Sequence, residues 1–121
     1  NLRKEISKSQ KFYFFDNGIR NILIDDLNGL SARNDRDALW ENFVLAERKK
    51  NLLYEKKHVN TYFWRTYSGV EIDYVEESGK DLSACEIKFA KSKDKAPKFW
   101  VDNYRSEFGV VNRENYKDFI V

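Results

Sequence analysis

The chain has 121 residues, of which 41% are hydrophobic and 16% aromatic, and its formal net charge is +2. This length suits one domain with its own core but not two comfortable ones, and the aromatic content excludes a disordered tail. The overall charge is too small to indicate nucleic-acid binding, so any basic surface must be local.

The chain has a single cysteine, Cys85. It therefore has no disulfide framework and no thiolate zinc cluster, which favours a reducing, cytoplasmic setting. No apolar run approaches the roughly 18 residues of a membrane span, and no signal peptide is present, so we expect no membrane association. The chain begins at Asn1 and contains no methionine. We expect it to be a fragment of a longer protein.

The first third is expected to contain a linker, a strand and a helix. Residues 1–10 are polar and basic, so they predict a linker or the end of a preceding domain, and residues 11–121 form the domain itself. The aromatic run at residues 11–15 predicts a buried strand. Asp16 can cap a helix whose apolar residues follow helical spacing, at Ile19, Ile22, Leu23 and Leu27. A loop over residues 27–36 follows.

A longer helix is predicted over residues 35–50, with Asn34 or Asp35 as its N-cap. Its apolar face contains Leu39, Trp40, Phe43, Val44 and Ala46. Glu41 falls beside this face and not opposite it. It could form a helix-surface ion pair with Arg48 or Lys49, or it could point a third carboxylate at the hairpin described next.

Residues 61–67, 69–75 and 83–89 read as three strands, and the Ser78-Gly79 pair predicts a hairpin turn between the last two. Because side chains alternate faces along a strand, Val70, Ile72 and Tyr74 are expected on one face and Glu71, Asp73 and Val75 on the other. Glu86 and Lys88 share a face of the next strand, opposite Cys85, Ile87 and Phe89. Pairing the two apolar faces gathers Asp73, Glu86 and Lys88 on one side.

Two carboxylates on neighbouring strands can hold Mg²⁺ or Mn²⁺ and leave coordination places for water and a phosphate oxygen. Lys88 would reach the same space and stabilise developing negative charge. This combination suits phosphodiester hydrolysis. The alternative is an ordinary half-exposed hairpin on which Glu86 and Lys88 form a solvated pair.

Residues 88–98 contain five lysines and one aspartate. Such a run is usually a solvated loop, but at the mouth of a site it could contact nucleic-acid phosphates through Lys91, Lys93, Lys95 and Lys98. Pro97 then suits the first turn of a helix with a core stripe at Trp100, Val101, Tyr104 and Phe108, capped by Gly109. A short strand at residues 110–111 and a final strand at residues 116–121 complete the chain.

The predicted order is helix, three strands, helix, strand. A helical crossover favours parallel neighbours, so we expect a mixed α/β sheet with helices on its faces. This α-β-β-β-α-β order, with Glu41 on the first helix, Asp73 on the second strand and Glu86-x-Lys88 on the third, resembles the PD-(D/E)xK or restriction-endonuclease-like superfamily. The stretches KFYFFDNGIRNILI, ALWENFVLAE, YFWRTYSGVEIDYV and CEIKF resemble the uncharacterised C-terminal domain of prokaryotic AAA+-type P-loop ATPases, over roughly residues 11 to 112.

The resemblance implies metal binding by Asp73 and Glu86, a catalytic or phosphate-facing role for Lys88, and assistance from Glu41. It implies Mg²⁺ or Mn²⁺ as cofactor, DNA as substrate, and ATP only in an upstream ATPase domain, since this chain has no Walker A sequence. Ile72 stands where a proline often precedes the first acid. The alternatives are a catalytically silent module that binds nucleic acid or docks a partner, and a structural domain that helps the ATPase oligomerise.

Overall fold

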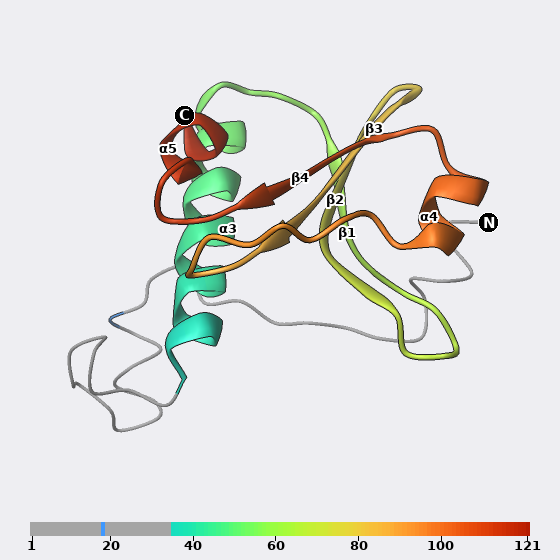
Figure 1. Ribbon diagram of the computed structural model, residues 1–121. Helices are drawn as coiled ribbons and strands as arrows, with labels where there is room; N and C mark the ends of the chain where they lie inside the picture. Colours follow the sequence, from blue (N-terminus) through green and yellow to red (C-terminus); the bar gives the residue numbers. More distant parts are fainter. Residues whose placement is uncertain (1–17, 19–34) are drawn as a thin grey trace.

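A computed structural model describes residue 18 and residues 35–121 of the chain. Its elements, in order, are α3 (Arg36–Tyr54), β1 (Asn60–Arg65), β2 (Glu71–Ser78), β3 (Asp81–Ile87), α4 (Lys98–Asn103), β4 (Glu107–Val111) and α5 (Tyr116–Ile120). The described strands form one sheet in the order β1-β2-β3-β4 (Figure 1). The first three are antiparallel, and β4 runs parallel to β3. The predicted mixed sheet is confirmed. The strand predicted at residues 11–15 and the helix at residues 19–27 lie outside the described residues.

Helix α3 begins after Asp35, as predicted, but continues to Tyr54, beyond the predicted end at residue 50. The extra turn buries Leu52, which is only 4% exposed. Lys56 then adopts a left-handed conformation with φ of 56°. The N–H groups of Glu55 and Lys57 donate to the carbonyls of Asn51 and Leu52 and close the helix end.

The hairpin of β2 and β3 turns at Gly79 and Lys80, between the paired residues Ser78 and Asp81. Gly79 has φ of 61°, a conformation that costs a glycine little and other residues more. The turn fixes the register, and the ladder continues to the pair Tyr74 and Cys85. The predicted hairpin is confirmed.

Strict alternation along β2 is wrong. Ile72 and Val75 pack in the same cluster, whereas Tyr74 packs in the other. The cause is a change of register in the pairing with β1, where Tyr62 lies opposite Val75 but Trp64 lies opposite Ile72. Strand β2 therefore carries one extra residue at this point, which reverses the faces on either side of it.

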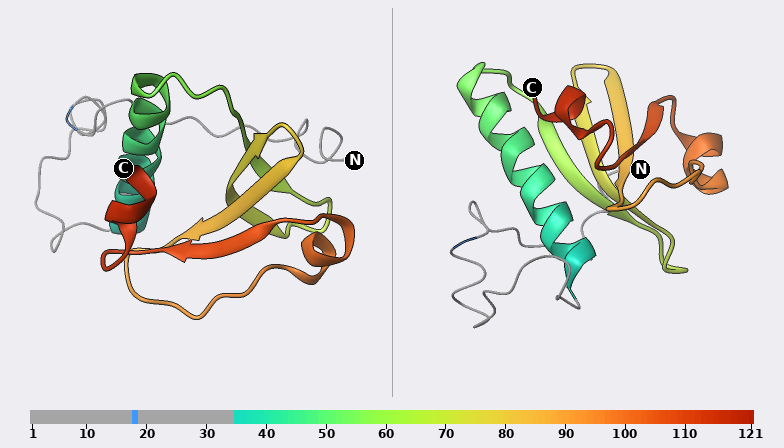
Figure 2. Two further views of the ribbon diagram at one scale, coloured as in Figure 1. Left: turned by 90° about the horizontal axis from the view of Figure 1, so that it is seen from above. Right: turned by 60° about the vertical axis from the view of Figure 1, so that its left-hand side comes forward.

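Each face of the sheet supports a separate core, and Figure 2 shows α3 and α4 on opposite sides. The α3 side contains Trp40, Val44, Leu45, Tyr74, Cys85, Ile87 and Val111, with residues of α5 packed against them. The α4 side contains Trp64, Ile72, Val75, Ala84 and Trp100. The predicted common face of Cys85 and Ile87 is confirmed, and Phe89 packs beside them.

Helix α4 is shorter than predicted and ends at Asn103, since Tyr104 is extended. Tyr104 instead stacks on Trp100, with ring centroids 4.3 Å apart, and the Trp100 indole donates to the Ser106 hydroxyl at 2.8 Å. Val101 is 59% exposed, so its place in the predicted core stripe is wrong. Gly109 lies inside β4 and not at a helix cap.

The final strand predicted at residues 116–121 is also wrong, because Tyr116–Ile120 forms helix α5. The Asn112 side chain accepts hydrogen bonds from the backbone N–H groups of Glu114 and Asn115, and this turn starts the helix. Tyr116, Phe119 and Ile120 then pack on the α3-side core. Their spacing is helical, whereas a strand would point neighbours to opposite faces.

Candidate functional site

Asp73 and Glu86 lie together where the β2–β3 ladder ends. The ladder ends at the pair Tyr74 and Cys85, and Asp73 and Glu86 are the residues that come next on the two strands. Their carboxyl groups share a hydrogen bond. The backbone N–H of Ile87 donates to Asp73 Oδ2 at 2.8 Å. A carboxylate thus takes the place of a backbone acceptor, which fixes its orientation between the strands.

Asp73 influences the ionisation of Glu86. Burial raises the pKa of Glu86, and a hydrogen bond with Asp73 and the negative charge of Asp73 raise it further, to about 8. Lys88 acts in the opposite direction. At neutral pH the Glu86 carboxyl therefore holds a proton beside Asp73, which is the usual outcome for two close carboxyl groups that cannot both ionise freely.

Lys88 follows β3 directly, and its backbone N–H donates to the carbonyl of Val111 at 2.9 Å. Its Nζ lies 3.7 Å from Asp94 Oδ2, and both side chains are a little under half exposed. The Asp94 backbone N–H donates to the Ser92 hydroxyl at 3.2 Å, which shapes the loop. Asp94 also raises the pKa of Glu86. Sequence reasoning missed Asp94, whose only signal was its place as the single acid in the lysine run.

Glu41 does not complete a three-ligand site. Within residues 35–121, no group of three or more His, Cys, Asp or Glu side chains is placed to hold a metal ion. Arg48, one of the partners considered for Glu41, bonds to Glu76. Glu71, which was expected on the same face as Asp73, lies 3.5 Å from Arg65 in an exposed ion pair. The assisting role of Glu41 stays a prediction.

Three of the predicted phosphate-contacting lysines lie on the segment that leads from β3 to α4, and Lys98 is the first residue of α4 (Figure 1). Lys91, Lys93, Lys95 and Lys98 are all exposed. Lys91 Nζ lies 3.6 Å from Glu114 Oε2, in a pair that is largely solvated. Their nucleic-acid contacts stay a prediction.

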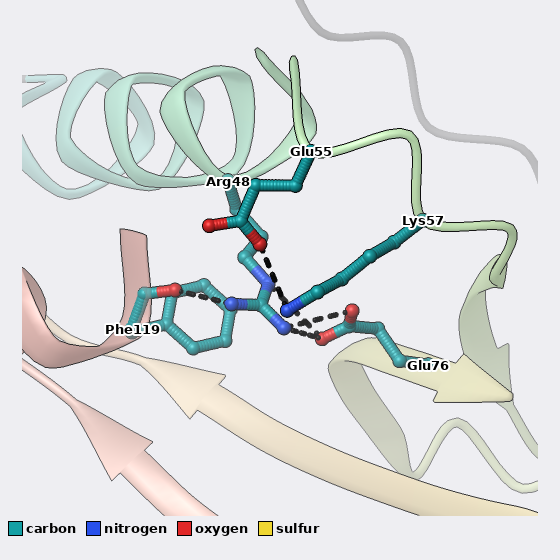
Figure 3. Close-up of polar contacts among 5 residues, drawn as sticks. All are labelled: Arg48, Glu55, Lys57, Glu76 and Phe119. Atoms are coloured by element: carbon teal, nitrogen blue, oxygen red, sulfur yellow. Dashed lines mark hydrogen bonds and ion pairs between the residues drawn. The ribbon is translucent and has the colours of Figure 1, made fainter. Parts of the chain in front are cut away.

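A second charged group ties α3, β2 and α5 together (Figure 3). Arg48 donates through Nη2 and Nε to both oxygens of Glu76, at 2.9 to 3.2 Å. Its Nη1 donates to the carbonyl of Phe119 at 2.6 Å, and its guanidinium lies 4.9 Å from the centre of that ring. The neighbouring Lys57 pairs with Glu55 at 2.9 Å. Sequence reasoning missed this link, since Arg48 and Glu76 are 28 residues apart in the chain.

Two open clefts lie along the Arg48–Glu76 pair, with volumes of about 720 and 370 Å³. The larger is lined by residues of both charge signs, including Lys57, Lys80, Asp81 and Arg105. Neither cleft includes Asp73, Glu86 or Lys88. The carboxyl pair brings together groups of specific chemistry and is therefore the candidate site, whereas both clefts are broad and open.

The chain matches the model of the domain of unknown function DUF4143 over residues 36–118 and belongs to this family. Neither a curated protein nor a solved structure gives a significant match. Within the described ranges, no helix is both long and apolar enough to cross a bilayer.

Proposed function

We propose that this DUF4143 domain is a metal-dependent nuclease that hydrolyses phosphodiester bonds of DNA. The observation that supports the proposal is the contact between Asp73 and Glu86, on neighbouring strands, with Lys88 two residues further on. Opposed carboxyl groups are costly to keep together without a proton or a cation between them.

The donor set suits Mg²⁺ or Mn²⁺. Both ions prefer oxygen ligands, and Mg²⁺ in particular is commonly bound by one or two carboxylates together with water and substrate phosphate. Asp73 and Glu86 supply two such groups, and the bond from the Ile87 N–H holds Asp73 in one orientation. The proton on Glu86 is the charge that a cation would replace.

Each residue of the candidate site would have a separate role in hydrolysis. A divalent ion held by Asp73 and Glu86 would supply a water of lowered pKa and neutralise phosphate charge. Lys88 would hold the phosphate and stabilise its developing charge, releasing Asp94 as it does so. Glu41 would assist in placing the water.

A catalytically silent module is the second candidate. It is favoured by one observation, that no third metal-ligating side chain joins the carboxyl pair within residues 35–121. In this case the exposed lysines of the β3–α4 segment would bind nucleic acid, or the domain would dock a partner, without cleavage.

We further propose that the domain works in the cytoplasm beside an AAA-type ATPase of the same protein, which would bind ATP and supply motion or control. The free and buried thiol of Cys85 agrees with a reducing compartment.

The test is cleavage of labelled single-stranded and duplex DNA with Mn²⁺, compared with EDTA. Lys88→Ala should lose at least tenfold in rate, because one positioned charge of this kind contributes about that much or more. Lys80→Ala, at the exposed hairpin turn, is the matched control and should cleave normally. Cleavage that survives Asp73→Asn unchanged would reject the nuclease, and DNA binding without cleavage would favour the silent module.

A further inference from the structure

Phe99, on α4, is an aromatic side chain left half open to solvent. It is 47% exposed, whereas the neighbouring Trp100 is 1% exposed. Its ring centroid lies 6.0 Å from that of Trp64, at an interplanar angle of 34°. Trp64 is fully buried. The ring is therefore supported from within the core while part of its surface remains available to a ligand.

The same end of the molecule carries further exposed apolar residues. The β1–β2 turn lies on the same side of the molecule as α4, away from α3, and below α4 in Figure 1 (Figures 1 and 2). In this turn Tyr67 is 80% exposed and Val70 is 40% exposed. The turn is ordered by bonds from the N–H of Thr66 to the Val70 carbonyl and from the N–H of Val70 to the Thr66 hydroxyl. The exposed apolar residues of this turn are therefore held in place by hydrogen bonds of the turn itself.

The charge beside this surface is positive. Lys93, Lys95 and Lys98 precede Phe99 and are exposed, and the only acid among residues 91–98, Asp94, is engaged by Lys88. The segment starts at Lys88, next to the carboxyl pair, and ends at Phe99 on α4. A phosphate chain that followed these lysines would connect the aromatic surface with Asp73 and Glu86.

We infer that Phe99 is a stacking platform for an unpaired base of single-stranded DNA, whose backbone follows Lys93, Lys95 and Lys98 toward the carboxyl pair. Lysines bind the backbone without reading sequence, and an exposed ring beside them adds base stacking. A duplex keeps its base faces covered and gains no stacking on Phe99. The inference rests on the proposed nuclease function and names its substrate as single-stranded DNA.

The experiment measures binding alone, in EDTA and low salt, so it does not depend on catalysis. The probe is a fluorescein-labelled oligothymidylate, compared with a hairpin duplex of equal length, and anisotropy gives Kd. Phe99→Leu keeps an apolar side chain but cannot stack, so it should weaken single-strand binding by about tenfold or more. Phe99→Trp should keep or improve it. Val101→Ala, which changes a residue 59% exposed on the same helix, should leave binding unchanged.

Three results would overturn the inference. One is equal affinity of the parent and Phe99→Leu, with circular dichroism showing that both fold. Another is an equal Kd for single strand and duplex that changes only with salt concentration, which would mean that the protein contacts only the DNA backbone. The third is no oligonucleotide binding, together with self-association that Phe99→Leu abolishes, which would assign the surface to a second copy of the chain. The cleavage assay with Mn²⁺ judges the nuclease proposal separately.

Discussion

Two acidic residues three positions apart on β2, Asp73 and Glu76, have partners of opposite kinds. Glu76 is 7% exposed and faces Arg48, a partner of opposite charge that bonds both of its oxygens. Asp73 faces Glu86, a partner of like charge, and the pKa of Glu86 rises to about 8. The first pair satisfies its own charge, whereas the second needs a proton or a cation from outside. The Arg48–Glu76 pair is therefore suited to stabilise the fold, and the Asp73–Glu86 pair is suited to take up a proton or a cation.

Removing one member of the satisfied pair should have the largest effect on stability. Glu76→Leu leaves Arg48 partly buried without its carboxylate and should cost about 3 kcal/mol of unfolding free energy. Urea denaturation measures this change in unfolding free energy. Glu47→Leu breaks the more exposed pair with Lys50 and should cost less than about 1 kcal/mol. Arg48→Met combined with Glu76→Leu should recover part of the loss, and equal costs for Glu76 and Glu47 would contradict the structural role.

The like-charged pair should make stability depend on pH in a defined direction. Because the pKa of Glu86 is raised from 4.5 to about 8, the unfolded chain releases this proton first. Stability is then full below pH 4.5 and falls as pH rises from 4.5 to about 8. Glu86→Gln should remove this fall. At pH 8.5 its unfolding free energy should exceed that of the parent by about 1 kcal/mol, after discounting for solvent screening.

Thermal melts of the parent and Glu86→Gln across this pH range, without metal, check the expectation. Glu77→Gln, one strand position beyond Glu76, is a control that should follow the parent's pH profile. The raised pKa of Glu86 would be contradicted if the stability of the parent, relative to Glu86→Gln, increased steadily up to pH 8.

The exposed pair of Lys88 and Asp94 should matter least for stability. Both side chains are a little under half exposed at 3.7 Å, so Asp94→Asn should change the unfolding free energy by less than about 1 kcal/mol. If the same substitution altered DNA cleavage, the effect would come from the placement of Lys88. A loss of several kcal/mol in urea denaturation would instead make Asp94 a structural residue.

The sequence was sufficient for the order of elements from α3 to β4 and for the hairpin, because these follow from local signals. Gly79 marks the turn, and the apolar spacing from Leu39 onward marks α3. The same hairpin places Asp73 and Glu86 just beyond the end of its ladder, where their carboxyl groups share a hydrogen bond. What could not be read was the extra residue in β2, since strict alternation cannot reveal where a partner strand changes register.

Other differences have the same origin in tertiary structure. Residues 116–121 favour a strand by composition, but the Asn112 turn and the packing of Phe119 on the α3 side make them helical. Arg48 finds its partner 28 residues away, at Glu76, and no local spacing predicts such a pair. Asp94 joins the site through the fold of its loop.

Calorimetric titration of Mn²⁺ into the chain tests the central claim most directly. The parent and an Asp73→Ala, Glu86→Ala double variant are compared, with Asp81→Asn, Asp102→Asn as a control that also removes two exposed negative charges. Circular dichroism establishes that all three fold, and buffers of different ionisation heat reveal proton release. We predict binding to the parent and the control, with release of the Glu86 proton below pH 8, and none to the double variant. No binding to the parent, or equal binding to the double variant, would contradict a metal site at the carboxyl pair.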